Sequence, residues 1–176
     1  VKNLLTLNQL ESGRDEVSME RFDIVSLIRG VLQSMDIMIQ QKEAKVSFEA
    51  SEPVYVWADE FKIEEVVTNY LTNAMNHLGG DHNIRIWSET LDGVAKIHVY
   101  NNGTPIPEED LPNLWTKFYK VDKARTRAYG GSGIGLSIVK AIMEAHHQQY
   151  GVANHEDGVE FWFTLALAPE KPEEEE

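Results

Sequence analysis

Apolar residues recur with helical spacing in two long stretches of this chain. In the first, Phe22 and Asp23 have the pattern of a hydrophobic staple followed by an N-cap, and apolar residues then follow at intervals of three and four through Ile39. In the second, the same spacing runs from Asp59, another candidate N-cap, to the helix-ending pair Gly79-Gly80. We therefore predict two long amphipathic helices, each with one face packed against a core.

Alternation of apolar and polar residues predicts short strands elsewhere. Two candidates are separated by a Ser-Glu-Pro turn, and two β-hairpins are expected around the turn pairs Asp92-Gly93 and Asp157-Gly158, whose residues tolerate positive φ. The predicted strands are residues 46–50, 54–57, 84–90 with 94–100, and 151–156 with 159–166.

Between the two hairpins lie an irregular stretch, residues 101–132, and a helix, residues 133–146. Such a long loop is uncommon inside a compact domain and is usually functional.

The first residues have the apolar stripe of a helix end, closed by Gly13. A short helix cannot shield this stripe, so we expect it to pack on preceding sequence or a second chain, or else to dock on the domain that follows. The start at Val1 indicates that the chain is cut from a longer protein. The expected units are a helix end with a linker (1–21), a folded domain (22–168) and a disordered acidic tail (169–176).

Composition limits the classes of function. The 176 residues carry 16 Lys and Arg against 29 Asp and Glu, a formal net charge of -13, so the chain lacks the field that gathers nucleic acid. The absence of cysteine excludes disulfides, thiolate metal sites and thiol nucleophiles. No apolar run is long enough to cross a membrane, and no two histidines have the i, i+4 spacing of a zinc site.

Three asparagines form a polar stripe on the second helix. Asn69, Asn73 and Asn76 are spaced by four and three residues, which places them on one side of the apolar face. Asparagine is a mediocre helix former, whereas carboxamide oxygens are hard ligands suited to Mg²⁺. The stripe therefore indicates a ligand site, with a solvated polar flank as the alternative.

Glycines precede the helix that follows the long loop. Gly131, Gly133 and Gly135 would let main-chain amides approach a phosphate at the helix N-terminus, where the helix dipole favours negative charge. Their spacing matches neither the Rossmann fingerprint nor the Walker A motif.

The same loop concentrates positive charge. Residues 116–131 hold five basic residues against one acid, a local balance of +5 - 1 = +4. A basic loop that ends at a glycine-rich helix start is what a lid over a nucleotide triphosphate and its Mg²⁺ requires. The alternative is a loop whose charge only keeps it solvated.

Together these segments resemble a known family. Asn69–Ala74 resembles the asparagine box, Asn102-Gly103 the first glycine box, Lys117–Asp122 the phenylalanine box and Gly131–Leu136 the second glycine box of the catalytic ATP-binding domain of bacterial sensor histidine kinases. The resemblance covers residues 22–167. Residues 4–13 also resemble the end of the dimerisation and phosphoacceptor hairpin that precedes that domain.

The resemblance implies an α+β fold, a two-layer Bergerat sandwich in which a mixed, mostly antiparallel sheet packs on three helices beside a flexible ATP lid. It implies two catalytic residues, Asn69 and Lys120, of which Lys120 would reach the terminal phosphate. Asn73 would bind Mg²⁺ with help from Asn69. The remaining ATP-binding residues would be Asn76, His77, Asn101, Gly103, Phe118, Arg125, Gly131, Gly133, Gly135 and Leu136.

Three positions depart from the family pattern. Asn101 stands where the family has an aspartate that accepts from the adenine amine, Asn76-His77 replaces a basic residue and an aromatic one, and Pro105 replaces a glycine. A carboxamide oxygen still accepts a hydrogen bond, without charge assistance. We interpret the departures as weaker nucleotide binding rather than inactivation.

The resulting hypothesis is a kinase that transfers the ATP γ-phosphoryl to a histidine on the missing hairpin, for relay to a response regulator aspartate. It implies a homodimer through that hairpin, a receiver domain as partner, and a cytoplasmic location with a membrane anchor only in other regions. A non-catalytic nucleotide-binding regulatory module is the alternative. A superfamily ATPase or serine kinase is disfavoured because Asn69 stands where the related ATPases have a glutamate base.

Three histidines lie outside these boxes on predicted elements. His146 and His147, at the end of the last helix, are expected to be structural, and His98, which alternates with apolar residues on a strand, is expected to be exposed.

Overall fold

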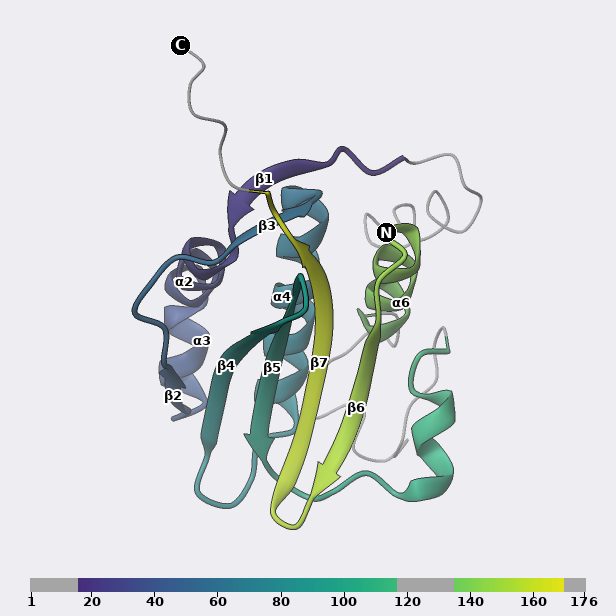
Figure 1. The fold of residues 1–176 in the computed structure, drawn as a ribbon. Helices are drawn as coiled ribbons and strands as arrows, with labels where there is room; N and C mark the ends of the chain where they lie inside the picture. Colours follow the sequence, from purple (N-terminus) through teal and green to yellow (C-terminus); the bar gives the residue numbers. More distant parts are fainter. Residues whose placement is uncertain (1–15, 117–134, 170–176) are drawn as a thin grey trace.

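A computed structural model of the chain describes residues 16–116 and 135–169. Within these residues seven strands form one sheet, and the α-helices lie together against one of its faces (Figure 1). The elements in chain order are β1 Glu20–Asp23, α2 Ile24–Ser34, α3 Asp36–Gln41, β2 Lys45–Phe48, β3 Tyr55–Ala58, α4 Glu60–Asn76, β4 Asn83–Leu91, β5 Val94–Asn102, the 3-10 helix η1 Glu108–Asn113, α6 Gly135–Ala145, β6 Tyr150–His155 and β7 Gly158–Leu167.

The sheet is mixed and mostly antiparallel. Its strand order is β1-β3-β7-β5-β4-β2, with β6 paired to β7, and the pairing of β2 with β4 is parallel. One edge of β7 pairs with β5, while the other pairs first with β6 and then with β3. The predicted two-layer α+β sandwich is therefore confirmed.

Both predicted hairpins form, but their turns differ. Asp92 and Gly93 have φ of 53° and 79°, as expected for the turn between β4 and β5. Neither Asp157 nor Gly158 has a positive φ, so the predicted reason for Gly158 was wrong. A β-carbon at Gly158 would collide with the Asn101 carbonyl oxygen and the Tyr100 side chain, so close packing against β5 requires the glycine.

The first predicted helix is interrupted. Asp23 caps α2 as expected by accepting from the Val25 amide, but the helix ends at Ser34 and α3 begins at Asp36. Met35 leaves helical geometry with φ -102° and ψ 13°, and the Ser34 hydroxyl donates to the Val31 carbonyl oxygen at 2.8 Å. Such a back-bond competes with the helix ladder and favours a bend. The expectation of one continuous helix was wrong.

An edge strand was not expected from the sequence. Residues 20–23 form β1, which pairs antiparallel with β3 and sets Phe22 opposite Val56. Phe22 is buried. It was expected only to pack against the first turn of the helix, and it also covers the edge of the hydrophobic core. The stripe of residues 1–12 and the tail from residue 170 lie outside the described residues.

The core lies between the sheet and α2, α4 and α6. Helix α4 begins after Asp59, whose side chain accepts from the Lys62 amide, as predicted. Tyr70 is fully buried against the rings of Phe161 and Phe163, and its hydroxyl donates to the Trp162 carbonyl oxygen at 2.9 Å. Burial raises the pKa of Tyr70 well above its usual range.

Within residues 16–116 and 135–169, no helix combines the length and apolarity of a membrane span.

Candidate functional site

The asparagine stripe lies along α4 beside the buried face of that helix. Asn69, Asn73 and Asn76 are each partly exposed, while Tyr70 and Ala74 between them are buried. The stripe therefore flanks the apolar face, as predicted from its spacing.

The side chain of Asn69 is fixed by its own helix. Its amide nitrogen Nδ2 donates to the Glu65 carbonyl oxygen at 2.8 Å. The carboxamide oxygen Oδ1 faces Gly135, where a β-carbon would lie only 2.9 Å from it. Since real β-carbons essentially never approach so closely, glycine at 135 lets the start of α6 pack against the asparagine stripe.

Leu136 follows Gly135 in α6 and is partly buried against the core. The structure thus places Gly135 of the second glycine box against α4 and packs its neighbour Leu136 on the core. The other predicted site residues of the loop lie outside the described residues: Phe118, Lys120, Arg125, Gly131 and Gly133.

The first glycine box lies at the C-terminal end of α4. His77 is the exposed C-cap of that helix, and a β-carbon at Gly103 would come within 2.5 Å of the His77 carbonyl oxygen. The Gly79 amide donates to the Asn102 carbonyl oxygen at 3.0 Å. The end of β5 therefore crosses close to the end of α4, and Gly103 is required by that approach.

Asn101 is buried at this crossing, with 1% of its surface exposed. Its Nδ2 donates to two main-chain oxygens, Asn102 O at 2.9 Å and His77 O at 3.4 Å. Both bonds use the donor end of the carboxamide, so the acceptor Oδ1 is the end left for a ligand.

The side chain of Asn102 also fixes the end of β5 through hydrogen bonds. Its Oδ1 accepts from the Asn83 amide at 2.9 Å, and its Nδ2 donates to the Tyr100 hydroxyl oxygen at 3.1 Å. The Tyr100 hydroxyl in turn donates to Asp157 Oδ1 at 2.6 Å. Burial and this bond raise the pKa of Tyr100, and the same bond lowers the pKa of Asp157.

The far ends of α4 and α6 are joined by Asp59 and His146. His146 Nε2 accepts from the Asp59 amide at 3.0 Å, and its Nδ1 lies 2.8 Å from the Ile142 carbonyl oxygen. The Asp59 carboxylate also accepts from the Ser18 amide at 2.8 Å, which ties the incoming chain to both helices. Burial lowers the pKa of His146, so the neutral ring is favoured. The predicted structural role of His146 agrees with these contacts.

His98 was expected to be exposed, and this was wrong. Only 4% of its surface is accessible, because its ring stacks on Trp87 with centroids 4.6 Å apart and lies between two carboxylates. Nδ1 contacts Glu160 Oε2, and Nε2 is 2.7 Å from Glu89 Oε2. Burial raises the pKa of Glu160, but its bonds with His98 and His155 outweigh this and hold the pKa below its usual range. The alternation of apolar and polar residues along β5 carries no information about the side chains of β4 and β7 that cover the His98 ring.

The main chain of Asp157, which the sequence marks only as a turn residue, also contributes to the site. The Asp157 carbonyl oxygen, between β6 and β7, accepts from the Gly103 amide at 3.0 Å. No sequence signal marked it, because the contact is made by the main chain of residues far apart along the chain.

Comparison with known proteins identifies relatives of this arrangement. Residues 58–169 match the family described as histidine kinase-, DNA gyrase B-, and HSP90-like ATPase. Sensor protein VanSB of Enterococcus faecalis is 30% identical over 165 residues, covering 94% of this chain and 37% of that protein. Sensor histidine kinase CusS of Escherichia coli is 29% identical over 165 residues, covering 94% of this chain and 34% of that protein. The chain thus spans about a third of the length of these relatives.

Solved structures of histidine kinases are also similar to this chain. The catalytic domain of histidine kinase ThkA, in a nucleotide-free form, superposes with a TM-score of 0.77 at 30% identity, covering 88% of this chain and 99% of that domain. The structure of ThkA in complex with the response regulator protein TrrA gives a TM-score of 0.75 at 28% identity, covering 97% of this chain and 48% of that one.

Proposed function

Because the chain belongs to the histidine kinase-, DNA gyrase B- and HSP90-like ATPase family, as the ATP-binding catalytic domain of a sensor histidine kinase, we propose that it binds Mg·ATP beside α4 and donates the γ-phosphoryl to a histidine. One observation carries the proposal. Segments far apart in sequence meet along α4, where Gly135 packs on Asn69 and Gly103 packs on His77. These two contacts support our proposal that the asparagine box, the first glycine box and the end of the second glycine box border one site.

The adenine end of this site fits Asn101. Its Nδ2 is held by two carbonyl oxygens, which leaves Oδ1 to accept from the exocyclic amine of adenine. Gly103, which has no side chain to fill the space beside His77, lines the same end. Asn76 and His77, at the end of α4, would face the phosphates with less positive charge than the family pattern provides.

The metal end of the site fits the asparagine stripe. Asn69 Oδ1 is directed away from its own helix, and Asn73 follows one turn later on the same side. Both offer neutral, hard oxygen ligands. We assign Asn73 as the principal Mg²⁺ ligand, assisted by Asn69. Bound Mg²⁺ supplies charge neutralisation across the phosphate oxygens.

The loop residues complete the proposal. Lys120 and Arg125 would neutralise the terminal phosphates, Phe118 would fasten the lid, and Gly131 and Gly133 would present main-chain amides ahead of α6. Leu136 anchors the start of α6 in the core.

The site favours transfer over hydrolysis. Asn69 cannot deprotonate water, because a carboxamide is not a base, so a pre-formed nucleophile is needed. A neutral imidazole nitrogen of the hairpin histidine attacks the γ-phosphorus, the bond to the β,γ-bridging oxygen breaks, and ADP leaves. Lys120 and the metal-binding asparagines would act by positioning and charge.

The proposed partners lie outside the chain. We propose a homodimer through the missing hairpin and a response regulator receiver domain as the acceptor from the phosphohistidine. The named complex of ThkA with the response regulator TrrA supports the second. We also propose that this catalytic domain is cytoplasmic and is joined to sensing regions elsewhere in the protein; the names of VanSB and CusS, both sensors, support the presence of sensing regions.

Two measurements test the proposal. Calorimetric titration with ADP and a non-hydrolysable ATP analogue should give binding that strengthens with Mg²⁺. The full-length protein incubated with γ-labelled ATP should form acid-labile, base-stable phosphohistidine. Binding without any transfer to histidine would contradict the kinase assignment and favour the regulatory module instead.

A further inference from the structure

A side chain of β6 is bonded to both main-chain groups of a residue beside the nucleotide site. Asn154 Oδ1 accepts from the Ile106 amide at 2.9 Å, and Asn154 Nδ2 donates to the Ile106 carbonyl oxygen at 2.8 Å. Two paired strand residues exchange bonds in this reciprocal way, and here a carboxamide takes the place of one peptide group. Ile106 is thereby paired to β6 without belonging to a strand.

The same hairpin end also holds the residues just before Ile106. The Asp157 carbonyl oxygen accepts from the Gly103 amide at 3.0 Å and from Asn102 Nδ2 at 3.5 Å. The loop from Gly103 to Ile106 is therefore fastened at both ends to the hairpin of β6 and β7. Pro105 and Pro107 fix φ on either side of Ile106, and the bonds at both ends of the loop limit the conformational freedom that Gly103 and Thr104 leave.

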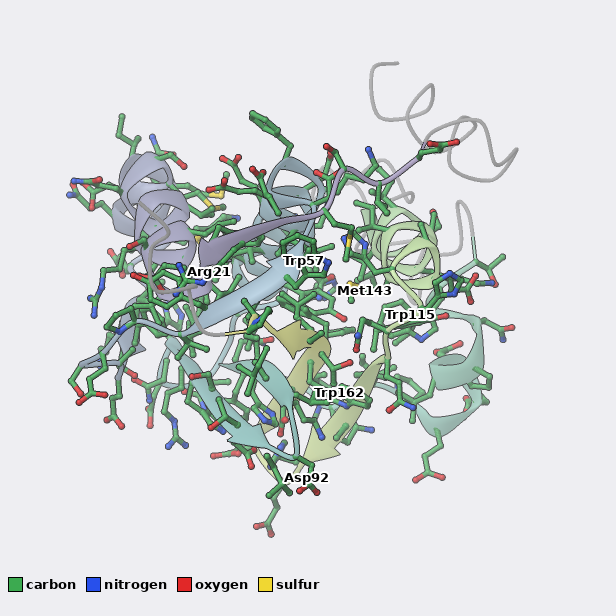
Figure 2. The ribbon with its side chains drawn as sticks, turned by 45° about the horizontal axis from the view of Figure 1, so that its top comes forward. Arg21, Trp57, Asp92, Trp115, Met143 and Trp162 are labelled. Atoms are coloured by element: carbon green, nitrogen blue, oxygen red, sulfur yellow. The ribbon has the colours of Figure 1, made fainter. Side chains whose placement is uncertain are left out.

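A third contact lies further along the same segment. Trp115, which follows η1, meets the edge of Tyr150 with ring centroids 4.8 Å apart and that of Phe161 at 5.9 Å. Trp115 lies on the same side of the molecule as α6 and its residue Met143 (Figure 2). Strand β6 thus fastens the segment that follows the first glycine box at two points, polar at Asn154 and aromatic at Tyr150.

The exposure of Asn154 separates a positioning role from a stabilising one. Its side chain is exposed, so water can replace both bonds when they break, and their net contribution to overall stability is small. Their effect on the loop is local, because they restrict the main chain between Gly103 and η1.

We propose that Asn154 is a positioning residue that holds the Gly103–Ile106 loop in the conformation that receives an adenine nucleotide. The inference rests on the proposed function of the site. A pre-ordered loop gives tighter nucleotide binding. The apparent affinity for the nucleotide is proportional to the fraction of molecules whose loop already has the binding-competent conformation.

The test compares Asn154→Ala and Asn154→Asp with the unchanged chain. Aspartate can accept from the Ile106 amide but sets a carboxylate against the Ile106 carbonyl oxygen. Asn113→Ala is the matched control, an exposed asparagine of η1 in the same segment. For each chain, calorimetry gives the affinity for ADP with Mg²⁺, amide hydrogen exchange reports Ile106, and thermal unfolding gives Tm.

We expect both Asn154 variants to bind ADP roughly five- to tenfold more weakly with little change in Tm, and Asn154→Ala, which loses the acceptor, to exchange the Ile106 amide faster. Asn113→Ala should match the unchanged chain. If the unchanged chain and Asn154→Ala bind ADP equally, or if only Tm falls, the positioning role is wrong while the proposed function stands. If the unchanged chain fails to bind ADP, the proposed function and this inference are both overturned.

Discussion

The side-chain oxygen of Asn69 lies against the main chain of Gly135, so closely that a β-carbon at position 135 would come within 2.9 Å of it. This contact joins the middle of α4 to the first residue of α6. A residue larger than glycine at 135 must displace the helix start or turn the carboxamide away.

Gly135→Ala is therefore expected to weaken Mg²⁺-dependent nucleotide binding roughly tenfold by disturbing a metal-binding side chain. Gly30→Ala is the matched control, because nothing lies within 4 Å of a β-carbon added there in α2. That control should leave affinity unchanged and raise the free energy of unfolding by about 0.5–1 kcal/mol. Calorimetry and urea unfolding measure the two quantities. Equal nucleotide affinities for the two variants would contradict the role of the contact.

Replacing Asn73 tests the metal assignment. Asn73→Ala should remove the strengthening of nucleotide binding by Mg²⁺, while the free energy of unfolding falls by less than about 1 kcal/mol because the side chain is partly exposed. Thr68→Ala, at an exposed position of the same helix, should retain the Mg²⁺ effect. The measurement is titration with the ATP analogue with and without Mg²⁺. Retention of the metal effect by Asn73→Ala would show that the metal lies elsewhere.

Restoring the family residue at position 101 should not improve binding. In Asn101→Asp, a carboxylate oxygen would replace the Nδ2 that now donates to the carbonyl oxygens of His77 and Asn102. Because the site is buried, we expect the free energy of unfolding to fall by about 1–3 kcal/mol. ADP affinity should not rise above that of the unchanged chain. Stability at the original level together with tighter ADP binding would refute this interpretation of the bonds.

The contact between His146 and Asp59 predicts a pH dependence of stability. The unfolded chain takes up a proton on this ring near the ordinary pKa of 6.5, whereas the folded chain does so only at lower pH because burial lowers the pKa. The unfolded state therefore binds more protons, and the free energy of unfolding decreases as the pH falls from above 6.5 toward the folded-state pKa. Protonation also removes the Nε2 acceptor used by the Asp59 amide.

His146→Asn should be less stable at pH 8 by about 1–3 kcal/mol, with a flatter decline below pH 7. His147→Asn is the control, since His147 is exposed at φ 58°, a conformation that asparagine tolerates. Urea unfolding between pH 5.5 and 8 compares the two variants with the unchanged chain. Parallel pH profiles for the unchanged chain and His146→Asn would assign the dependence to other groups.

Lys120 is expected to act on transfer rather than on nucleotide retention. In the full-length protein, Lys120→Ala should lower the rate of phosphohistidine formation by more than it lowers ADP affinity, because ADP lacks the γ-phosphate. Lys140→Ala, at an exposed position on α6, is the control. An equal loss of transfer and of ADP affinity would contradict contact with the terminal phosphate.

The sequence by itself determined the elements whose signals are local. Helical spacing and the Asp59 cap gave α4 and the side on which Asn69, Asn73 and Asn76 lie, because both depend on residues within a few positions of each other. The Asp92-Gly93 pair gave its hairpin for the same reason, through the positive φ of both residues. Four spaced motifs indicated the family, although spacing gave no distances between them.

Only the tertiary structure decided features made by contacts between distant segments. Alternation could not show that His98 is covered by Trp87 and held between two glutamates, and composition could not show that Gly158 is required by packing against Asn101. Periodicity also passed over the break at Met35, because the apolar face continues through α3. The bonds of Asn154 to Ile106 join residues 48 positions apart. Such pairings depend on how the strands are arranged in the sheet. A local sequence pattern carries no information about that arrangement.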